Sequence, residues 1–186
     1  MTLCSIASGN SGICMFTGTE STSILIDAGI SGKRVENGLN TLGYTGKDLD
    51  GILVTHEHSD HIKGLGVLAR RLQIPIYATP RTIDAILGHS SLGKFPEGIF
   101  NTISADEQFE IGDLKIDPFA ISHDAAEPVG YRISHEDRSV GIATDLGKYD
   151  DYIVGHLQGL DALLLEANHD VNMLQVGAYP YHLKQR

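Results

Sequence analysis

Short apolar runs separated by polar turns dominate the chain, and in its first half they predict strands that alternate with helices. Residues 60–72 carry apolar side chains at the spacing of a helix that buries one face; these are Ile62, Leu65, Leu68, Ala69 and Leu72. The same reasoning predicts helices at 33–42 and 80–87, the second beginning with Pro80 after Thr79. Strands are predicted at 3–7, 13–17, 23–29, 51–55 and 74–78.

The second half of the chain has mainly strand-like patterns. Gly112-Asp113 separates two apolar runs as a hairpin turn would. Strands are predicted at 107–111, 114–121, 129–133, 139–144 and 161–167, with one helix at 149–157. This order suits two sheets packed face to face with helices outside, an αββα sandwich of the α/β (α+β) class. Residues 1–186 are predicted to form a single domain.

Five of these strands end at or near a side chain that is acidic or can bind a metal. The residues concerned are Asp27, His56, His123, Asp145 and His169. Strand ends that meet at one edge of a sandwich bring such side chains together. The pattern therefore predicts an active site at that edge.

The densest group of metal-binding side chains follows the apolar run 51–55. His56, His58, Asp60 and His61 occupy four of six positions. Alternate residues of an extended chain point the same way, so His56 and His58 can bind one ion together. Asp60 and His61 fall in the first turn of the predicted helix, which Ser59 would cap, and can serve a second ion. Without a metal these side chains would crowd together with no structural benefit, so a metal site is predicted.

The composition limits which binding surfaces and cellular locations we expect for the protein. The net charge of −10 argues against an extended basic surface for nucleic acid. No apolar run approaches the ~18 residues needed to cross a membrane, and the first residues lack the pattern of a secretory signal. Only two cysteines occur, Cys4 and Cys14, and we expect both to be reduced and buried in a cytoplasmic protein.

The motif His56-x-His58-x-Asp60-His61 after an apolar strand resembles the signature of the metallo-β-lactamase fold hydrolases. The resemblance implies two ions. His56, His58 and His123 would bind the first, Asp60 and His61 the second, and Asp145 would bridge both. Asp27 would support the metal-binding loop by orienting its imidazoles.

A closer resemblance is to the YycJ/WalJ-type group of predicted DNA exonucleases. It rests on three stretches of sequence: residues 8–12, which lie between the two cysteines, residues 123–126 followed by 128–131, and residues 166–170. Ser8, Asn10 and Ser11 then have two interpretations: a plain hairpin turn, or a loop whose N–H groups and hydroxyls approach a substrate phosphate.

The favoured interpretation is therefore a two-metal phosphodiesterase acting on DNA, with Zn or Mn as the ions and Fe as a further candidate. A hydroxide shared by the ions would attack phosphorus, and Asp60 or Asp145 would orient the water. His169 would donate a proton to a phosphate oxygen or the leaving group, or would only bond a backbone carbonyl.

Two rival interpretations stay open. One is a hydrolase of small thioesters or esters with the same metals. The other is a metal-binding chain with little turnover, because the resembled family supplies a further histidine to the second ion beyond the point that Arg186 reaches. On this interpretation the C-terminal part of the sandwich is missing, the first site alone is filled, and the chain associates with copies of itself to cover an apolar sheet face.

Overall fold

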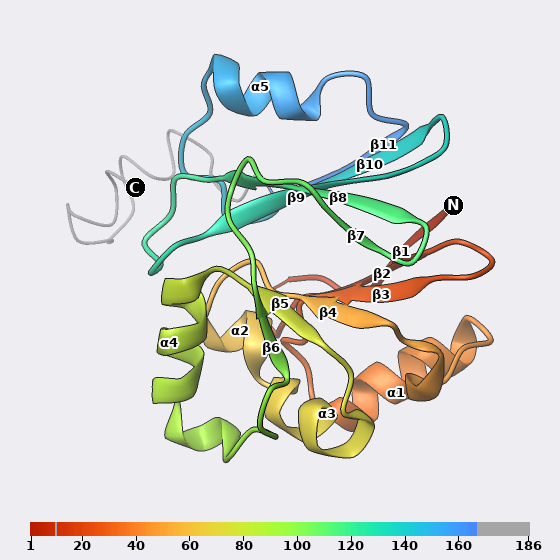
Figure 1. Cartoon of the computed structure of the whole chain (residues 1–186), viewed down its shortest axis with the longest axis vertical. Helices are drawn as coiled ribbons and strands as arrows, with labels where there is room; N and C mark the ends of the chain where they lie inside the picture. The colour runs from red at the N-terminus through yellow and green to blue at the C-terminus, as the bar shows by residue number, and fades with distance from the viewer. Residues whose placement is uncertain (10, 167–186) are drawn as a thin grey trace.

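The computed structural model describes residues 1–9 and 11–166, and it confirms the predicted sandwich of two sheets between outer layers of helices (Figure 1). The first sheet has the strand order β1-β2-β3-β4-β5-β6 and the second the order β11-β10-β9-β8-β7. The first sheet comprises β1 (Thr2–Ala7), β2 (Cys14–Gly18), β3 (Ser23–Ile26), β4 (Gly51–Leu53), β5 (Ile76–Ala78) and β6 (Phe100–Thr102). The second comprises β7 (Phe109–Ile111), β8 (Leu114–Ala120), β9 (Val129–His135), β10 (Arg138–Ala143) and β11 (Ala162–Leu165).

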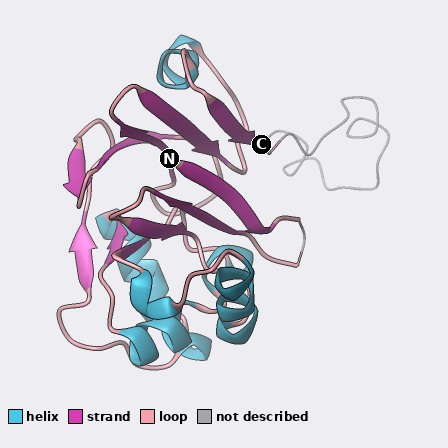
Figure 2. Ribbon diagram, turned by 90° about the vertical axis from the view of Figure 1, so that its right-hand side faces the viewer, coloured by secondary structure: helices cyan, strands magenta, loops and turns pink. Residues whose placement is uncertain are grey.

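The helices cover the outer faces of the two sheets. Most of them lie against the first sheet, and one lies across the second, as the turned view in Figure 2 shows. They are α1 (Gly32–Thr41), α2 (Ser59–Ile62), α3 (Leu65–Leu72), α4 (Pro80–Gly88) and α5 (Asp151–Leu157), with short 3₁₀ turns at Gly46–Asp48 and Ser90–Leu92.

Alternation along the strands builds the core on both faces of the first sheet. In β3, Ile24 and Ile26 face the second sheet, while Leu25 packs under the helices. In β2, Met15 and Phe16 divide in the same way. Successive side chains of a strand point to opposite faces, so a strand that is apolar throughout belongs in a sheet covered on both sides.

The predicted helix over 60–72 is wrong in one respect, because the structure divides it into α2 and α3. The break lies at Lys63-Gly64, where the Gly64 N–H donates to Ala28 O at 2.7 Å. A Cβ on Gly64 would lie 2.1 Å from Ile30 O. The chain therefore turns where its backbone touches the segment after β3, a contact that helical periodicity does not reveal.

Two smaller expectations also need correction. His58, not Ser59, is the residue that precedes the first helical turn, and its side chain makes no capping bond. Cys14 is fully buried as expected, but Cys4 is only half-buried in the edge strand β1; both are free. Among the described helices, none is long and apolar enough to cross a membrane.

Candidate metal centre

Four of the five predicted strand-end residues lie in the described part of the chain, and these four meet at one edge of the sandwich. Asp27 follows β3, the His56–His61 segment joins β4 to α2, and His123 and Asp145 lie in the segments after β8 and β10. Asp27 and Asp145 both have left-handed backbone conformations, with φ of 60° and 54°. Aspartate tolerates this conformation better than most residues, and here it turns the chain away from the strand directly at the carboxylate.

Backbone contacts hold α2 in place beneath the site. Ile13 N donates to Asp60 O at 2.8 Å, and Ala28 N donates to His61 O at 2.7 Å. Gly29 permits this approach, since a Cβ there would lie 1.5 Å from Asp60 O. Asp60 and His61 are the two residues of α2 that carry candidate ligands. Their backbone is thus held by Ile13, just before β2, and by Ala28, after β3.

Three histidines form the first group of donor atoms. His58 Nδ1 lies 3.1 Å from His56 Nε2 and 3.1 Å from His123 Nε2. Four-coordinate Zn–N bonds of about 2.1 Å would separate two ligand nitrogens by ~3.4 Å. The spacing of these nitrogens therefore fits three ligands of one ion.

A second group shares His56 with the first and adds His61 and Asp145. Asp145 Oδ2 lies 2.9 Å from His61 Nε2 and 3.8 Å from His56 Nε2. Both His61 Nε2 and Asp145 Oδ2 are buried, and within the described part of the chain neither makes a well-aligned hydrogen bond. A buried imidazole nitrogen and a buried carboxylate oxygen this close together, in one group with His56 Nε2, suit a shared cation.

Behind the histidines, Asp27 and Thr55 fix the orientation of the rings. Asp27 Oδ2 accepts a hydrogen bond from His61 Nδ1 at 2.8 Å and from the Thr55 hydroxyl at 2.8 Å, while Oδ1 accepts from Thr55 N. Because the Thr55 proton points to Asp27, Thr55 Oγ1 accepts from His56 Nδ1 at 3.0 Å. This assignment leaves His56 Nε2 with a lone pair that faces the cluster. Asp27 therefore contacts the metal-binding loop, and its role as a support of the imidazoles, which the resemblance implies, stays a prediction.

The proton affinities of the cluster are strongly shifted. Burial and the neighbouring imidazoles lower the pKa of His56 to about 2. Burial opposes a charge on His61, but the carboxylates of Asp27 and Asp145 raise its pKa to about 10. Burial likewise opposes a charge on Asp145, yet the adjacent His61 lowers the pKa of Asp145. One positive charge is thus favoured between two carboxylates, and a divalent cation can supply it in place of the proton.

Of the remaining predicted site residues, Asp60, Ser8 and Ser11 belong to the described part of the chain. Asp60 is at its margin, with Oδ2 at 3.9 Å from His61 Nε2 and a side chain that is 45% exposed. Ser11 belongs to the same loop as Ser8 and is exposed. Asn10 and His169 lie outside the described residues.

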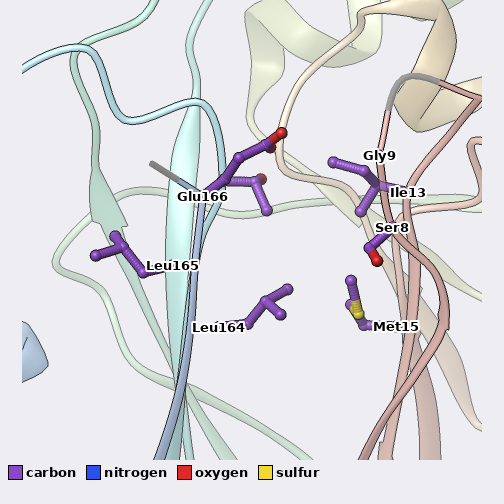
Figure 3. A pocket seen from close by; sticks show the side chains of 8 residues that line it. Ser8, Gly9, Ile13, Met15, Leu164, Leu165 and Glu166 are labelled. Atoms are coloured by element: carbon purple, nitrogen blue, oxygen red, sulfur yellow. The ribbon is translucent and has the colours of Figure 1, made fainter. Parts of the chain in front are cut away.

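Ser8 lines a pocket of about 460 Å³ that also contains Thr144, the neighbour of Asp145. Figure 3 shows Ser8 and Met15 facing Leu164 across this pocket, with Glu166 at its rim. Ser8 therefore shares a pocket with the residue that precedes Asp145.

Two residues of the central motif that belong to neither donor group, Thr55 and Glu57, were missed as supports. Thr55 links Asp27 to both buried imidazoles, and Glu57 accepts a hydrogen bond from Ala126 N at 2.8 Å. A hydroxyl next to a histidine is a weak signal in a sequence. The partner of Glu57 lies 69 residues away along the chain, and nothing in the spacing indicates it.

Comparison with known proteins agrees with this geometry. Residues 22–186 match the family model of the beta-lactamase superfamily domain. The chain belongs to this superfamily. It is 41% identical over 181 residues to a Bacillus anthracis protein named exodeoxyribonuclease YycJ, a match that covers 97% of this chain and 68% of the relative.

Solved structures of the superfamily share the fold at low sequence identity. The Rm3 metallo-β-lactamase has a TM-score of 0.67 at 18% identity, covering 88% of this chain and 74% of that one. Zn²⁺-bound PqqB from Methylobacterium extorquens has a TM-score of 0.72 at 18% identity, covering 90% and 64%. The predicted family and sandwich fold are thus confirmed.

Proposed function

We propose that this member of the superfamily is a metal-dependent phosphodiesterase that removes nucleotides from the end of a DNA strand with two divalent ions. The observation that carries the proposal is the pair of donor groups joined at His56. Asp145 Oδ2 lies 3.8 Å from Nε2 of the shared His56 and 2.9 Å from His61 Nε2, which supports a bridging role for this carboxylate. Two adjacent ions can clamp both the attacking and the leaving oxygen of a phosphodiester.

The proposal assigns the ligand atoms of the two donor groups to the two ions. His56 Nε2, His58 Nδ1 and His123 Nε2 would hold one ion, and His61 Nε2 with Asp145 would hold the other. Bound divalent ions make water acidic and neutralise charge on phosphoryl oxygens. Zn and Mn both suit a site of imidazoles and carboxylates, with Fe as a further candidate. The superfamily neighbour PqqB is described as Zn²⁺-bound, which supports the first choice.

Carboxylates of the chain would orient the attacking water. We assign Asp145 and Asp60 to orient it, Asp145 from between the donor groups and Asp60 from the exposed margin, where solvent and substrate arrive. The role of His169 as a proton donor remains a prediction on a residue outside the described part of the chain.

Two observations support DNA as the substrate. The Bacillus anthracis relative is named an exodeoxyribonuclease. Ser8 lines a pocket with Thr144, the neighbour of Asp145, and we assign the hydroxyls of Ser8 and of Ser11 to donate to phosphate oxygens. Because the chain carries a net charge of −10, bound cations would have to supply most of the attraction for phosphate. Two free cysteines suit a reducing compartment, so a cytoplasmic site of action is part of the proposal.

The test is release of nucleotides from end-labelled DNA with Mn or Zn present. We expect release by the wild-type chain and a loss of about 100-fold or more in His58→Ala, because removing an imidazole takes away a ligand of the first ion. Glu110→Ala, an exposed substitution in β7, serves as the control for loss of one negative charge and should match wild type. A chain that leaves DNA intact but hydrolyses a thioester would instead favour the small-molecule hydrolase.

A further inference from the structure

Glu57 stands between two proposed ligands, His56 and His58, yet it contributes no atom to either donor group. Its side chain reaches across to the segment between β8 and β9. There Glu57 Oε1 accepts a hydrogen bond from Ala126 N at 2.8 Å. The same segment carries His123, the third imidazole of the first donor group, so this one bond joins the two stretches of chain that supply all three nitrogens.

The His123 segment is also held at other points by hydrogen bonds to neighbouring segments. Val129 N donates to Thr55 O at 3.0 Å, and the Thr79 hydroxyl donates to Glu127 O at 2.8 Å. At the other end, Gly147 N donates to Ser122 O at 2.8 Å. These bonds fix both ends of the segment, whereas Glu57 fixes its middle, opposite the histidine pair.

The Glu57 carboxylate is not a freely moving surface group. Its Oε2 atom is buried, and among the described residues it has no hydrogen-bond partner. A carboxylate held this way loses hydration, so the bond that Oε1 makes to the backbone N–H counts for more than it would in water. Breaking that bond would leave the Ala126 N–H to find a new acceptor and would free the middle of the segment.

We infer that Glu57 is a positioning residue: through its bond to Ala126 N it sets the separation of His123 from His58 and thereby the affinity of the first metal site. The inference rests on the proposed metal centre. His58 Nδ1 and His123 Nε2 lie 3.1 Å apart, close to the separation of two ligands on one ion. Residues behind the ligands typically change metal affinity by about 10- to 100-fold when they are replaced.

Three substitutions separate an acceptor role from a role of the negative charge. Glu57→Gln keeps an oxygen at the position of Oε1 and removes the charge. Glu57→Asp keeps the charge but is one methylene too short to reach Ala126 N. Glu57→Ala removes both. If Glu57 acts as an acceptor, Gln restores the wild-type property and Asp does not.

The experiment is a titration of each metal-free variant with Co²⁺, followed by the visible absorption of the bound ion. We expect Glu57→Ala and Glu57→Asp to bind Co²⁺ about 10- to 100-fold more weakly than wild type, and Glu57→Gln and the control Glu110→Ala to bind like wild type. The thermal midpoint of each metal-free variant is measured alongside, since a purely structural role would lower that midpoint and leave the Co²⁺ affinity unchanged.

The other outcomes are equally informative. Wild-type affinity in both Glu57→Ala and Glu57→Asp would overturn the inference, and so would a Gln variant as weak as Ala. If Glu57→Ala does not fold, the comparison of Asp with Gln decides alone. A wild-type chain whose Co²⁺ spectrum is the same as that of His58→Ala would refute the metal centre itself, which separates failure of the proposed function from failure of the role of Glu57.

Discussion

At the scale of single residues, the site depends on a glycine, which has no side chain, as well as on its metal-binding side chains. Gly29 allows the backbone after β3 to touch α2, and the bonds from Ile13 N and Ala28 N to α2 depend on that approach. The sequence made the metal-binding residues conspicuous, because four of them cluster in six positions. It gave no comparable signal for Gly29, whose role exists only once two distant segments are in contact.

Gly29→Ala should therefore destabilise the protein and disturb the second donor group. The new Cβ would lie 1.5 Å from Asp60 O and 2.7 Å from Ile13 N, and backbone atoms cannot move aside as a flexible side chain can. We expect a loss of about 1–3 kcal/mol in the free energy of unfolding, measured by urea denaturation of the metal-free chain.

Gly155→Ala is the matched control. Gly155 lies within α5, and a Cβ there would have no neighbour within 4 Å. Alanine is the better helix former, so this variant should be as stable as wild type or more stable, by up to about 1 kcal/mol. Equal destabilisation in both variants would show that the close contact at Gly29 is unimportant.

At the scale of elements, the sequence predicts strands and helices well where they depend on their own periodicity. The hairpin at Gly112-Asp113 and the alternation in β2 and β3 are of this kind. The division of the helix at Gly64 is not, because it is imposed by a backbone contact with Ala28. Likewise the sequence places Asp27 at a strand end, but only the fold shows that its two oxygens bond Thr55 and His61.

One bond joins the two sheets directly behind the metal centre. The Tyr131 hydroxyl of β9 donates to Val54 O, just after β4, at 2.7 Å. Tyr131 is fully buried, and burial with the nearby Asp27 raises the pKa of its phenol, so the donor proton is retained. The bond holds the start of the His56 segment against the second sheet.

Tyr131→Phe should cost about 1–3 kcal/mol of unfolding free energy, because it leaves the buried Val54 carbonyl without this donor. Tyr149→Phe, at a residue that is 77% exposed, should change the stability by no more than about 0.5 kcal/mol. Guanidinium denaturation monitored by circular dichroism gives both values. Identical curves for the two variants would show that the link between sheets contributes little.

At the scale of the whole molecule, a second set of polar contacts joins the two sheets. It lies where a hairpin turn of one sheet meets a hairpin turn of the other. Asp113, in the β7–β8 turn, accepts hydrogen bonds from the Thr19 hydroxyl at 2.9 Å and the Ser21 hydroxyl at 2.7 Å, in the β2–β3 turn. His135 Nε2 lies 3.2 Å from the same carboxylate. Hydroxyls of Thr22, Ser21 and Thr19 hold the pKa of Asp113 well below its ordinary value of 3.8.

A carboxylate with a lowered pKa stabilises the folded state above its unfolded pKa and loses that contribution as the pH falls toward the folded value. We therefore expect wild type to be more stable than Asp113→Asn near pH 5, and the difference to shrink as the pH falls below about 4. Urea titrations of both proteins at a series of pH values measure this. A difference that does not change with pH would contradict the assignment.

The central claim is that one edge of this sandwich holds two metal ions, and anomalous diffraction at the zinc absorption edge tests it most directly. Crystals of the protein loaded with Zn²⁺ should show one strong peak among His56, His58 and His123. A second peak should lie beside His61 and Asp145, weaker because the first ion would use the single lone pair of His56 Nε2 and leave this group one imidazole and a carboxylate. The absence of any peak among the three histidines, in crystals that bind Zn²⁺ elsewhere, would contradict the account.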